Sequence, residues 1–179
     1  MSSLATLTAA GRAAIVLAIK SQPLHLAWGS GDPAWSADEN KAHLKEILTN
    51  KESLENELGR RQVAVSSFVL PDSDGDIVLP TGRQSDGTVQ QSRFRQVEGP
   101  TPHLFVRVNF DYEEAENQIV REVAVFMNTV VKPELPPGQR YFKPDEILNF
   151  GQMLSVQRLD PVLNRSSATR ESFEFVLSI

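Results

Sequence analysis

Cysteine is absent from the 179 residues of this sequence. The chain therefore has no disulfide, no thiolate metal site and no cysteine nucleophile. Aromatic residues are also scarce, at 7%, whereas hydrophobic residues make up 40% of the chain, a share that is ordinary for a soluble globular protein. A chain of this length can bury one hydrophobic core, and we predict a single domain over residues 1–179.

Positive charge is in deficit, with 18 Lys and Arg against 23 Asp and Glu and a net charge of -5. Nucleic-acid binding depends on clustered Lys and Arg that release counterions, so we expect no nucleic-acid partner. Long apolar runs are missing too, because AAIVLAI is interrupted by Lys20, short of the ~20 residues that a membrane-spanning helix needs. The N-terminus also lacks the order of segments that marks a signal peptide. We therefore expect no membrane partner.

Complete motifs for catalysis or cofactor binding are missing. The segment Gly29–Gly31 lacks the third glycine of a dinucleotide fingerprint and the Gly-Lys-Ser/Thr of a phosphate loop. The DSDGD segment at 72–76 has carboxylates at alternate positions, as calcium loops do, but it does not fit the EF-hand pattern, and an Asp-Gly turn is preferred. The histidines have no metal-ligand spacing; they are His25, His43 and His103. We predict no catalytic, cofactor-binding or metal-binding residue, and no cofactor.

The acidic segment DYEEAENQ, at 111–118, contains carboxylates that acid–base catalysis uses in pairs. Adjacent acidic residues in a polar connection are usually only solvated, and we prefer that interpretation. A catalytic triad can also be assembled in space from distant residues, without a local motif. An enzyme with such a site stays open as a less favoured alternative.

Arg121 and Glu122 lie inside the apolar segment IVREVAVF. Neighbouring residues of a strand face opposite sides, so these two cannot pair with each other. A buried charge needs another partner. The candidate partners are Glu57, Arg60, Arg61 and Arg107. We interpret Arg121 and Glu122 as structural core residues rather than catalytic ones.

Two regions have helical patterns. Apolar residues recur at helical spacing in LATLTAAGRAAIVLAIKSQ, with Thr8 as the predicted N-cap and Pro23 ending the helix. The charged segment 37–61 has a sparse apolar stripe, and Ser36–Glu39 at its start fits a capping box. It predicts one or two surface helices.

Most of the remaining chain has the period-two pattern of strands. We predict strands at 24–28, 62–70, 103–110, 119–131, 151–159 and 172–179, and another after the DSDGD turn. The strands at 103–110 and 119–131 are expected to form a hairpin or a neighbouring pair. Residues 81–92 are predicted as a polar loop, and 131–144 as a proline-rich extended connection. The fold class is α+β, a mostly antiparallel β domain with an N-terminal helix and one or two further surface helices.

The order of several segments resembles the N-terminal domain of bacteriophage tail-collar fibre proteins and related baseplate components. The segments are LTAAGRAAIVLAI, HLAWGSGDPAW, LENELGRRQVAVSSFV, IVREVAVF, and KPDEI followed by GQMLSVQ. Those proteins begin with a Thr-x-x-Gly helix, continue to a Gly-Asp turn, and have a Leu-x-x-Glu-x-x-Arg element before a strand. The similarity extends over most of the chain.

The resemblance implies a structural virion protein of a phage tail that attaches fibres or other appendages to the baseplate or tail. Such a protein is made in the host cytoplasm, is not an enzyme, and is oligomeric within the virion. Its partners would be other tail, baseplate or fibre proteins, with a place in the neck or collar as the alternative. Trp28 would anchor its core. Because the chain ends after a strand, without a Gly-rich shaft, we expect a compact adaptor.

Two irregular segments are predicted to contact partners, because extended arms can lie across a neighbouring protein. They are residues 81–92 and 131–144. Within the second, Leu135, Tyr141 and Phe142 are the predicted anchors. The alternative is that both segments are solvent-facing loops. The interface would then lie on the charged face at 41–57.

Overall fold

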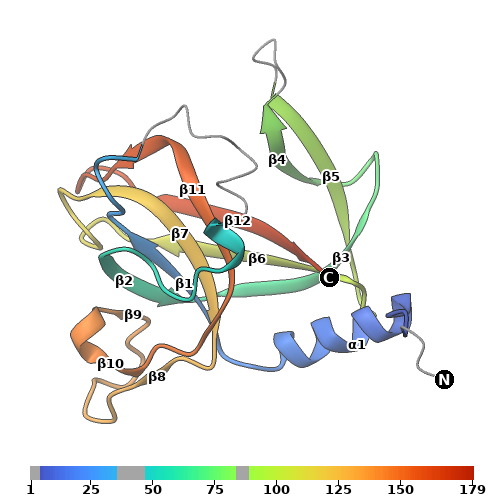
Figure 1. The fold of residues 1–179 in the computed structure, drawn as a ribbon, viewed down its shortest axis with the longest axis horizontal. Helices are drawn as coiled ribbons and strands as arrows, with labels where there is room; N and C mark the ends of the chain where they lie inside the picture. The colour runs from blue at the N-terminus through green and yellow to red at the C-terminus, as the bar shows by residue number, and fades with distance from the viewer. Residues whose placement is uncertain (1–4, 36–46, 84–88) are drawn as a thin grey trace. The chain divides into compact units, whose positions relative to one another are not determined.

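A computed structural model describes residues 5–35, 47–83 and 89–179 (Figure 1). The chain divides into two compact units. The first contains residues 1–21, 64–107 and 173–179, and the second contains 22–63 and 108–172. Strands β6 (His103–Phe110) and β12 (Glu171–Ser178) contribute residues to both units.

The first unit begins with the predicted helix, α1 (Ala9–Lys20). The Thr8 hydroxyl accepts a hydrogen bond from the Gly11 N–H at 3.0 Å, which confirms the predicted N-cap. A five-stranded sheet follows in the spatial order β12, β6, β3 (Val65–Pro71), β5 (Val89–Val97) and β4 (Ile77–Arg83). One cluster of its core consists of Val69, Leu79, Phe94 and Phe105.

The predicted loop at 81–92 is wrong at both of its ends. Residues 81–83 belong to β4 and residues 89–92 belong to β5, and the two strands pair in an antiparallel ladder, with Pro80 opposite Gln91. Residues 84–88 lie outside the described part of the chain. β5 has many polar side chains, but ladder hydrogen bonds come from the backbone and do not require apolar residues. The polar side chains of this segment therefore indicate a solvent-exposed pair of strands rather than a loop.

The second unit contains a sheet in the order β11 (Gln152–Asn164), β7 (Ile119–Met127), β1 (Leu24–Gly29), β2 (Glu57–Gln62) and β9 (Tyr141–Phe142). A short ribbon pairs β8 (Val130–Val131) with β10 (Ile147–Asn149), which follows the 3₁₀ helix η1 (Pro144–Glu146). All six residues of β1 are buried, because it has a neighbour on both edges and is covered on both faces.

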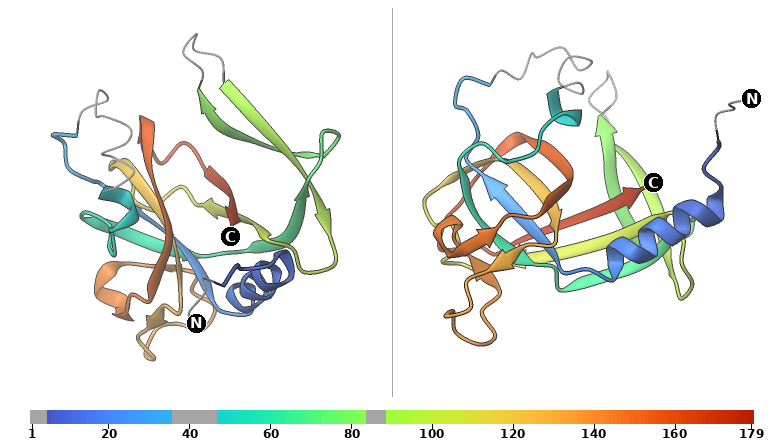
Figure 2. Two further views of the ribbon diagram at one scale, coloured as in Figure 1. Left: turned by 45° about the vertical axis from the view of Figure 1, so that its right-hand side comes forward. Right: turned by 60° about the horizontal axis from the view of Figure 1, so that its bottom comes forward.

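The helix prediction for 37–61 is wrong at its end, where residues 57–61 form part of β2. Among described residues of this segment, only 47–49 are helical, and 36–46, including the capping box, are outside the described part. The predicted pairing of 103–110 with 119–131 is also wrong. β6 neighbours β12 and β3, whereas β7 pairs with β1 and β11. The connection 111–118 joins strands of two different sheets. Figure 2 shows the chain in two further views.

About half of the residues that the structure describes lie in strands, so the fold is mostly antiparallel β with an N-terminal helix. β structure is therefore more dominant than the α+β class suggests. The strand predictions at 24–28, 103–110 and 172–179 agree with β1, β6 and β12. The strand predicted at 62–70 is displaced, because Gln62 ends β2 and β3 begins at Val65.

Candidate functional site

Residues 128–150, called the arm, are inserted between two paired strands of the second unit. The arm leaves β7 after Met127 and returns at Gln152, and these two residues face each other in the β7–β11 ladder. Asn128 has a φ of 60° and Gly151 has a φ of 74°, the left-handed region that these residue types adopt most readily. A Cβ at Gly151 would lie 2.0 Å from the Met127 carbonyl oxygen. Glycine is therefore required where the arm ends.

Arg60 holds the base of the arm. Its side chain is fully buried, and its Nη1 donates hydrogen bonds to Thr129 Oγ1 at 2.7 Å and to the Phe150 carbonyl at 2.6 Å. Its Nε and Nη2 donate to the two carboxylate oxygens of Glu57 at 2.8 and 2.7 Å. The guanidinium carbon also lies 4.1 Å from the centroid of the Phe126 ring. One arginine therefore connects β2 to both ends of the arm and is neutralised by a bidentate carboxylate.

Three large apolar side chains of the arm are exposed to solvent. The exposed fractions are 61% for Leu148, 50% for Val130 and 42% for Phe150. They lie in or next to the β8–β10 ribbon, in which Asn149 is opposite Val130. The Phe150 ring also lies 4.9 Å from the Arg60 guanidinium carbon, so this residue is fixed from the core side. Exposed apolar side chains on a fixed support are typical of protein–protein contacts.

The predicted anchors of this segment lie elsewhere in the arm. Phe142 is buried, with its ring 5.8 Å from that of His25. The Tyr141 hydroxyl donates to the Leu58 carbonyl and accepts from Trp28 Nε1, both at 3.2 Å. Leu135 is half-buried in a turn. The structure thus brings Tyr141 and Phe142 against the sheet and leaves Leu135 apart, and a partner-binding role for the three residues stays a prediction.

Sequence reasoning missed the exposed apolar residues of the arm. A signal exists in the segment ILNF at 147–150, where apolar residues occupy both parities of a short strand. Ile147 is buried and Leu148 is the most exposed large apolar side chain among described residues. An edge ribbon can bury only one of its faces, so apolar residues of both parities predict exposure of one set.

Trp28 occupies the centre of an aromatic cluster beneath β9. It is fully buried, and its ring is stacked on that of Phe110 at a centroid distance of 3.6 Å. Tyr141 meets both rings edge-on, at 6.3 Å from Trp28 and 6.2 Å from Phe110. Burial raises the pKa of Tyr141 to about 12, so its hydroxyl keeps its proton and its role as a donor.

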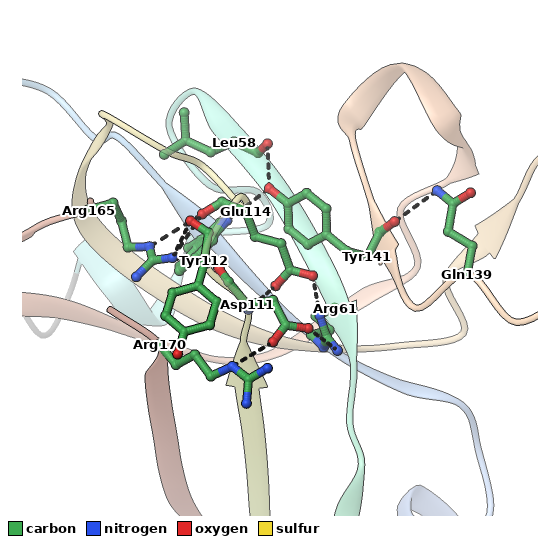
Figure 3. A network of polar contacts seen from close by, with 10 residues as sticks. Leu58, Arg61, Asp111, Tyr112, Glu114, Gln139, Tyr141, Arg165 and Arg170 are labelled. Carbon is green, nitrogen blue, oxygen red and sulfur yellow. Dashed lines mark hydrogen bonds and ion pairs between the residues drawn. The ribbon is translucent and has the colours of Figure 1, made fainter. Parts of the chain in front are cut away.

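A network of arginines and carboxylates lies beside this cluster (Figure 3). Arg61 forms ion pairs with Glu114 and, at 3.2 Å, with Asp111. Glu114 is buried and also accepts from the Asp111 N–H at 2.8 Å. The expectation that the acidic segment 111–118 is only solvated is therefore wrong for Glu114. Its burial raises its pKa, against the opposing effects of the Asp111 N–H and of Arg61.

Arg165 fixes the backbone of this network. Its buried guanidinium donates to the Asp111 carbonyl at 2.7 Å and to the Thr169 carbonyl at 2.9 Å, and lies 5.3 Å from the Trp28 ring. Arg170 reaches Asp111 from the outside at 3.0 Å and lies over the Tyr112 ring, as Figure 3 shows. Every charged group named here has an opposite charge or carbonyl beside it. The network therefore connects the turn after β6 to the chain after β11.

Glu122 has a partner that the sequence analysis did not consider. Its carboxylate accepts from Lys51 Nζ at 2.6 Å and from the Glu55 N–H, so all four predicted candidates are wrong. Glu122 faces Gly29 across the β1–β7 ladder, and a Cβ there would lie 2.9 Å from the Glu55 carbonyl oxygen. Glycine therefore lets the Lys51 segment approach the sheet. Arg121 points the other way and donates to the Ser30 carbonyl at 2.8 Å.

A hollow of about 640 Å³ lies next to the Glu122 pair. Two cations lie over the Trp35 ring, with Lys51 Nζ at 5.0 Å and the Arg158 guanidinium carbon at 3.8 Å from its centroid. The Glu122 carboxylate forms an ion pair with Lys51 and neutralises its charge. The lining residues are Trp35, Ile47, Lys51, Ser53, Leu54, Glu55, Asn56 and Arg158.

The turn at 72–76 and the histidines were the other candidates that the sequence analysis considered for metal binding or catalysis. Residues 72–76 form the predicted turn, in which the Gly75 N–H donates to the Asp72 carbonyl at 3.0 Å. His25 is buried and His103 Nδ1 lies 2.8 Å from Ser178 Oγ, while His43 is outside the described residues. Within the described ranges, no group of three His, Asp or Glu residues is placed to hold a metal ion. No helix in the same ranges is long and apolar enough to cross a membrane.

Comparison with known proteins identifies the family. Among curated proteins, none matches this sequence significantly. A family model described as baseplate wedge 3 tail fiber network component matches residues 4–179, a range that covers both compact units except residues 1–3. This match confirms the resemblance to phage baseplate and tail-fibre proteins. The chain belongs to the family of baseplate wedge 3 tail fiber network components, which are structural proteins of the phage baseplate in the virion.

Proposed function

We propose that the protein is an adaptor that attaches tail fibres or other appendages to the baseplate, and that the arm is its contact with a neighbouring baseplate or fibre protein. The observation that supports this most is the exposure of Val130, Leu148 and Phe150 on an arm whose base is fixed by Arg60. In this role residues 1–179 act as one adaptor domain within an oligomeric assembly. The activity is that of a connector, and no residue has a catalytic role.

The construction of the arm suits this role. A stable interface buries ~1,200–2,000 Å² in total, but a few central residues supply most of the binding energy. Leu148 and Val130 have the exposure of such central residues before a partner binds. Charged residues lie near them in the arm and would form the polar rim; they are Lys132, Glu134, Lys143 and Asp145. Because Arg60 fixes the arm in advance, binding would cost little conformational entropy.

The test is a variant that removes the apolar surface without touching the core. We expect Leu148→Ser combined with Val130→Ser to leave the isolated protein folded, because both side chains are at least half exposed. Incorporation of this variant into baseplates should fall strongly, as measured by quantitative mass spectrometry of purified particles. Val162→Ser is the matched control, since Val162 is an exposed apolar residue of the same unit, outside the arm.

The proposal is refuted if the double variant enters infectious particles at the wild-type level. A second measurement identifies the partner, namely cross-linking of intact baseplates followed by mass spectrometry of peptides from residues 128–150. A cross-link from the arm to a fibre or wedge protein is expected. Cross-links confined to other surfaces of this chain would move the adaptor contact away from the arm.

A further inference from the structure

The helix α1 presents an apolar face to solvent. Successive residues of an α-helix are rotated by ~100°, so five of its residues share one side of the cylinder. All five are exposed, with fractions of 40% for Ile15 and 47% for Leu17. The members of this face, called the α1 outer face, are Ala10, Ala14, Ile15, Leu17 and Ala18. Figure 2 shows α1 in blue in two views.

The charged residues of α1, Arg12 and Lys20, lie on either side of the buried Val16 in the helical wheel. Lys20 Nζ is 5.6 Å from the centroid of the Phe68 ring, and Arg12 Nη1 donates to the Leu7 carbonyl at 3.0 Å. A surface helix normally buries its apolar stripe and exposes its charges. In α1 the buried residue is Val16 alone, and the apolar outer face is exposed, which is the pattern of a helix that is covered by another protein.

The charge around α1 indicates the kind of partner. Residues 1–31 contain Arg12 and Lys20 and no acidic residue, whereas all 23 Asp and Glu lie in residues 32–179. The first part therefore has a net charge of +2 and the rest has -7. In the wheel of α1, Arg12 lies about 60° beyond Ile15, and Lys20 lies about 60° beyond Leu17. One cation therefore lies beyond each edge of the apolar face.

We propose that the α1 outer face binds an amphipathic helix of another baseplate protein, whose apolar stripe is bordered by Asp and Glu. The twelve residues of α1 give a straight face about 18 Å long, which fits one helix laid along it. The small side chains Ala10, Ala14 and Ala18 allow helix axes to approach to ~8–10 Å. Carboxylates of the partner would then reach Arg12 and Lys20. This surface is independent of the arm.

A second copy of the chain fits this surface less well. Two α1 helices in contact would bring together four cations without an acidic residue among them. The exposed apolar residues of the arm lie among balanced charges, Lys132, Arg140 and Lys143 against Glu134, Asp145 and Glu146, so they offer no net attraction. Charge complementarity therefore favours a different protein.

Photo-crosslinking in assembled baseplates tests the proposal. We expect Leu17→p-benzoylphenylalanine to cross-link to a helical segment of another virion protein in which acidic residues border the apolar stripe. The same amino acid at Glu98, an exposed residue of the same unit, is the control and should not cross-link to that segment. Cross-linking to a second copy of this chain, to a segment without bordering acidic residues, or to no protein overturns the proposal.

Charge variants add an independent readout. We expect Arg12→Gln with Lys20→Gln to lower the yield of the Leu17 cross-link by on the order of tenfold, since two surface ion pairs are lost. Gln91→Glu with Gln96→Glu lowers the net charge by the same amount on β5 and should leave the yield unchanged. Equal yields in the two charge variants overturn the proposal. Sedimentation of the purified chain should also show no self-association through the α1 outer face. If the chain self-associates and Ala14→Glu abolishes this association, the face binds a second copy and the proposal is wrong.

Discussion

Replacing Arg60 by methionine removes the group that connects β2 to the arm. The Glu57 carboxylate, whose side chain is 8% exposed, is then left buried without its cation. Removing one partner of a buried ion pair costs about 3–5 kcal/mol. For a protein of this size, about 1 kcal/mol corresponds to ~2–4 °C in Tm, so we expect a decrease of roughly 6–20 °C. Urea unfolding followed by tryptophan fluorescence measures the change in free energy.

The control for this prediction is the double variant Arg60→Met with Glu57→Leu. It replaces the ion pair by apolar side chains, and Thr129 Oγ1 can still donate to the Phe150 carbonyl, from which it lies 3.2 Å away. We expect the double variant to be more stable than Arg60→Met alone, although it carries an additional substitution. Hydrogen exchange of residues 128–150 should be faster in both variants. The reasoning is refuted if the single variant loses less than about 1 kcal/mol, or if the double variant is the less stable of the two.

Three further variants test the titrating groups and the aromatic cluster. Burial, and to a smaller extent Arg60, lowers the pKa of His25 to about 4, so the native state loses stability as the pH falls below 6.5, by about 3 kcal/mol at most. His25→Leu should reduce this pH dependence of stability, as measured by urea unfolding at pH 7 and pH 4.5. An unchanged pH dependence would contradict the prediction. Because burial raises the pKa of Glu114, the stability of the wild type relative to Glu114→Gln should fall as the pH rises above 4.5, and an increase would show that Arg61 outweighs burial. Tyr141→Phe should cost about 1–3 kcal/mol, since it removes the hydrogen bonds with Leu58 and Trp28, and an unchanged urea midpoint would argue against both.

Elements with local signals could be predicted from the sequence. The helix α1 depends on Thr8 and Pro23, which act within a few residues of its ends. The strand β6 depends on an alternation of apolar residues within its own length. In contrast, β2 has the charged composition of a surface helix. It forms a strand in which Arg60 and Arg61 face opposite sides of the sheet, and each pairs with a carboxylate. Local composition cannot show that such charges are paired.

The functional regions were harder to predict because their partners are distant in the chain. Glu122 pairs with Lys51, 71 positions away, and Arg61 pairs with Glu114, 53 positions away. Such pairs form only after the sheets are assembled, so no spacing rule applies to them. The prolines indicated only residues 131–144 of the arm, and its two ends are fixed by Arg60, a residue outside it. Phe142 is buried in a strand that pairs with β2, whereas Leu148 is exposed, and residue type alone did not distinguish them.

The position of the arm between Met127 and Gln152 allows its length to change without a change in the β7–β11 ladder. Its two ends adjoin residues that face each other in one ladder, so a change in its length leaves the register of β7 and β11 unaltered. Loop closure also costs little more when a loop grows, about 0.6 kcal/mol for each doubling. The parts of the arm outside β9 (Tyr141–Phe142) can therefore change while the strands of the sheet stay constant, provided that Arg60 keeps its two acceptors. The length and surface of the arm can in this way vary among related proteins without a change in the strands that support it.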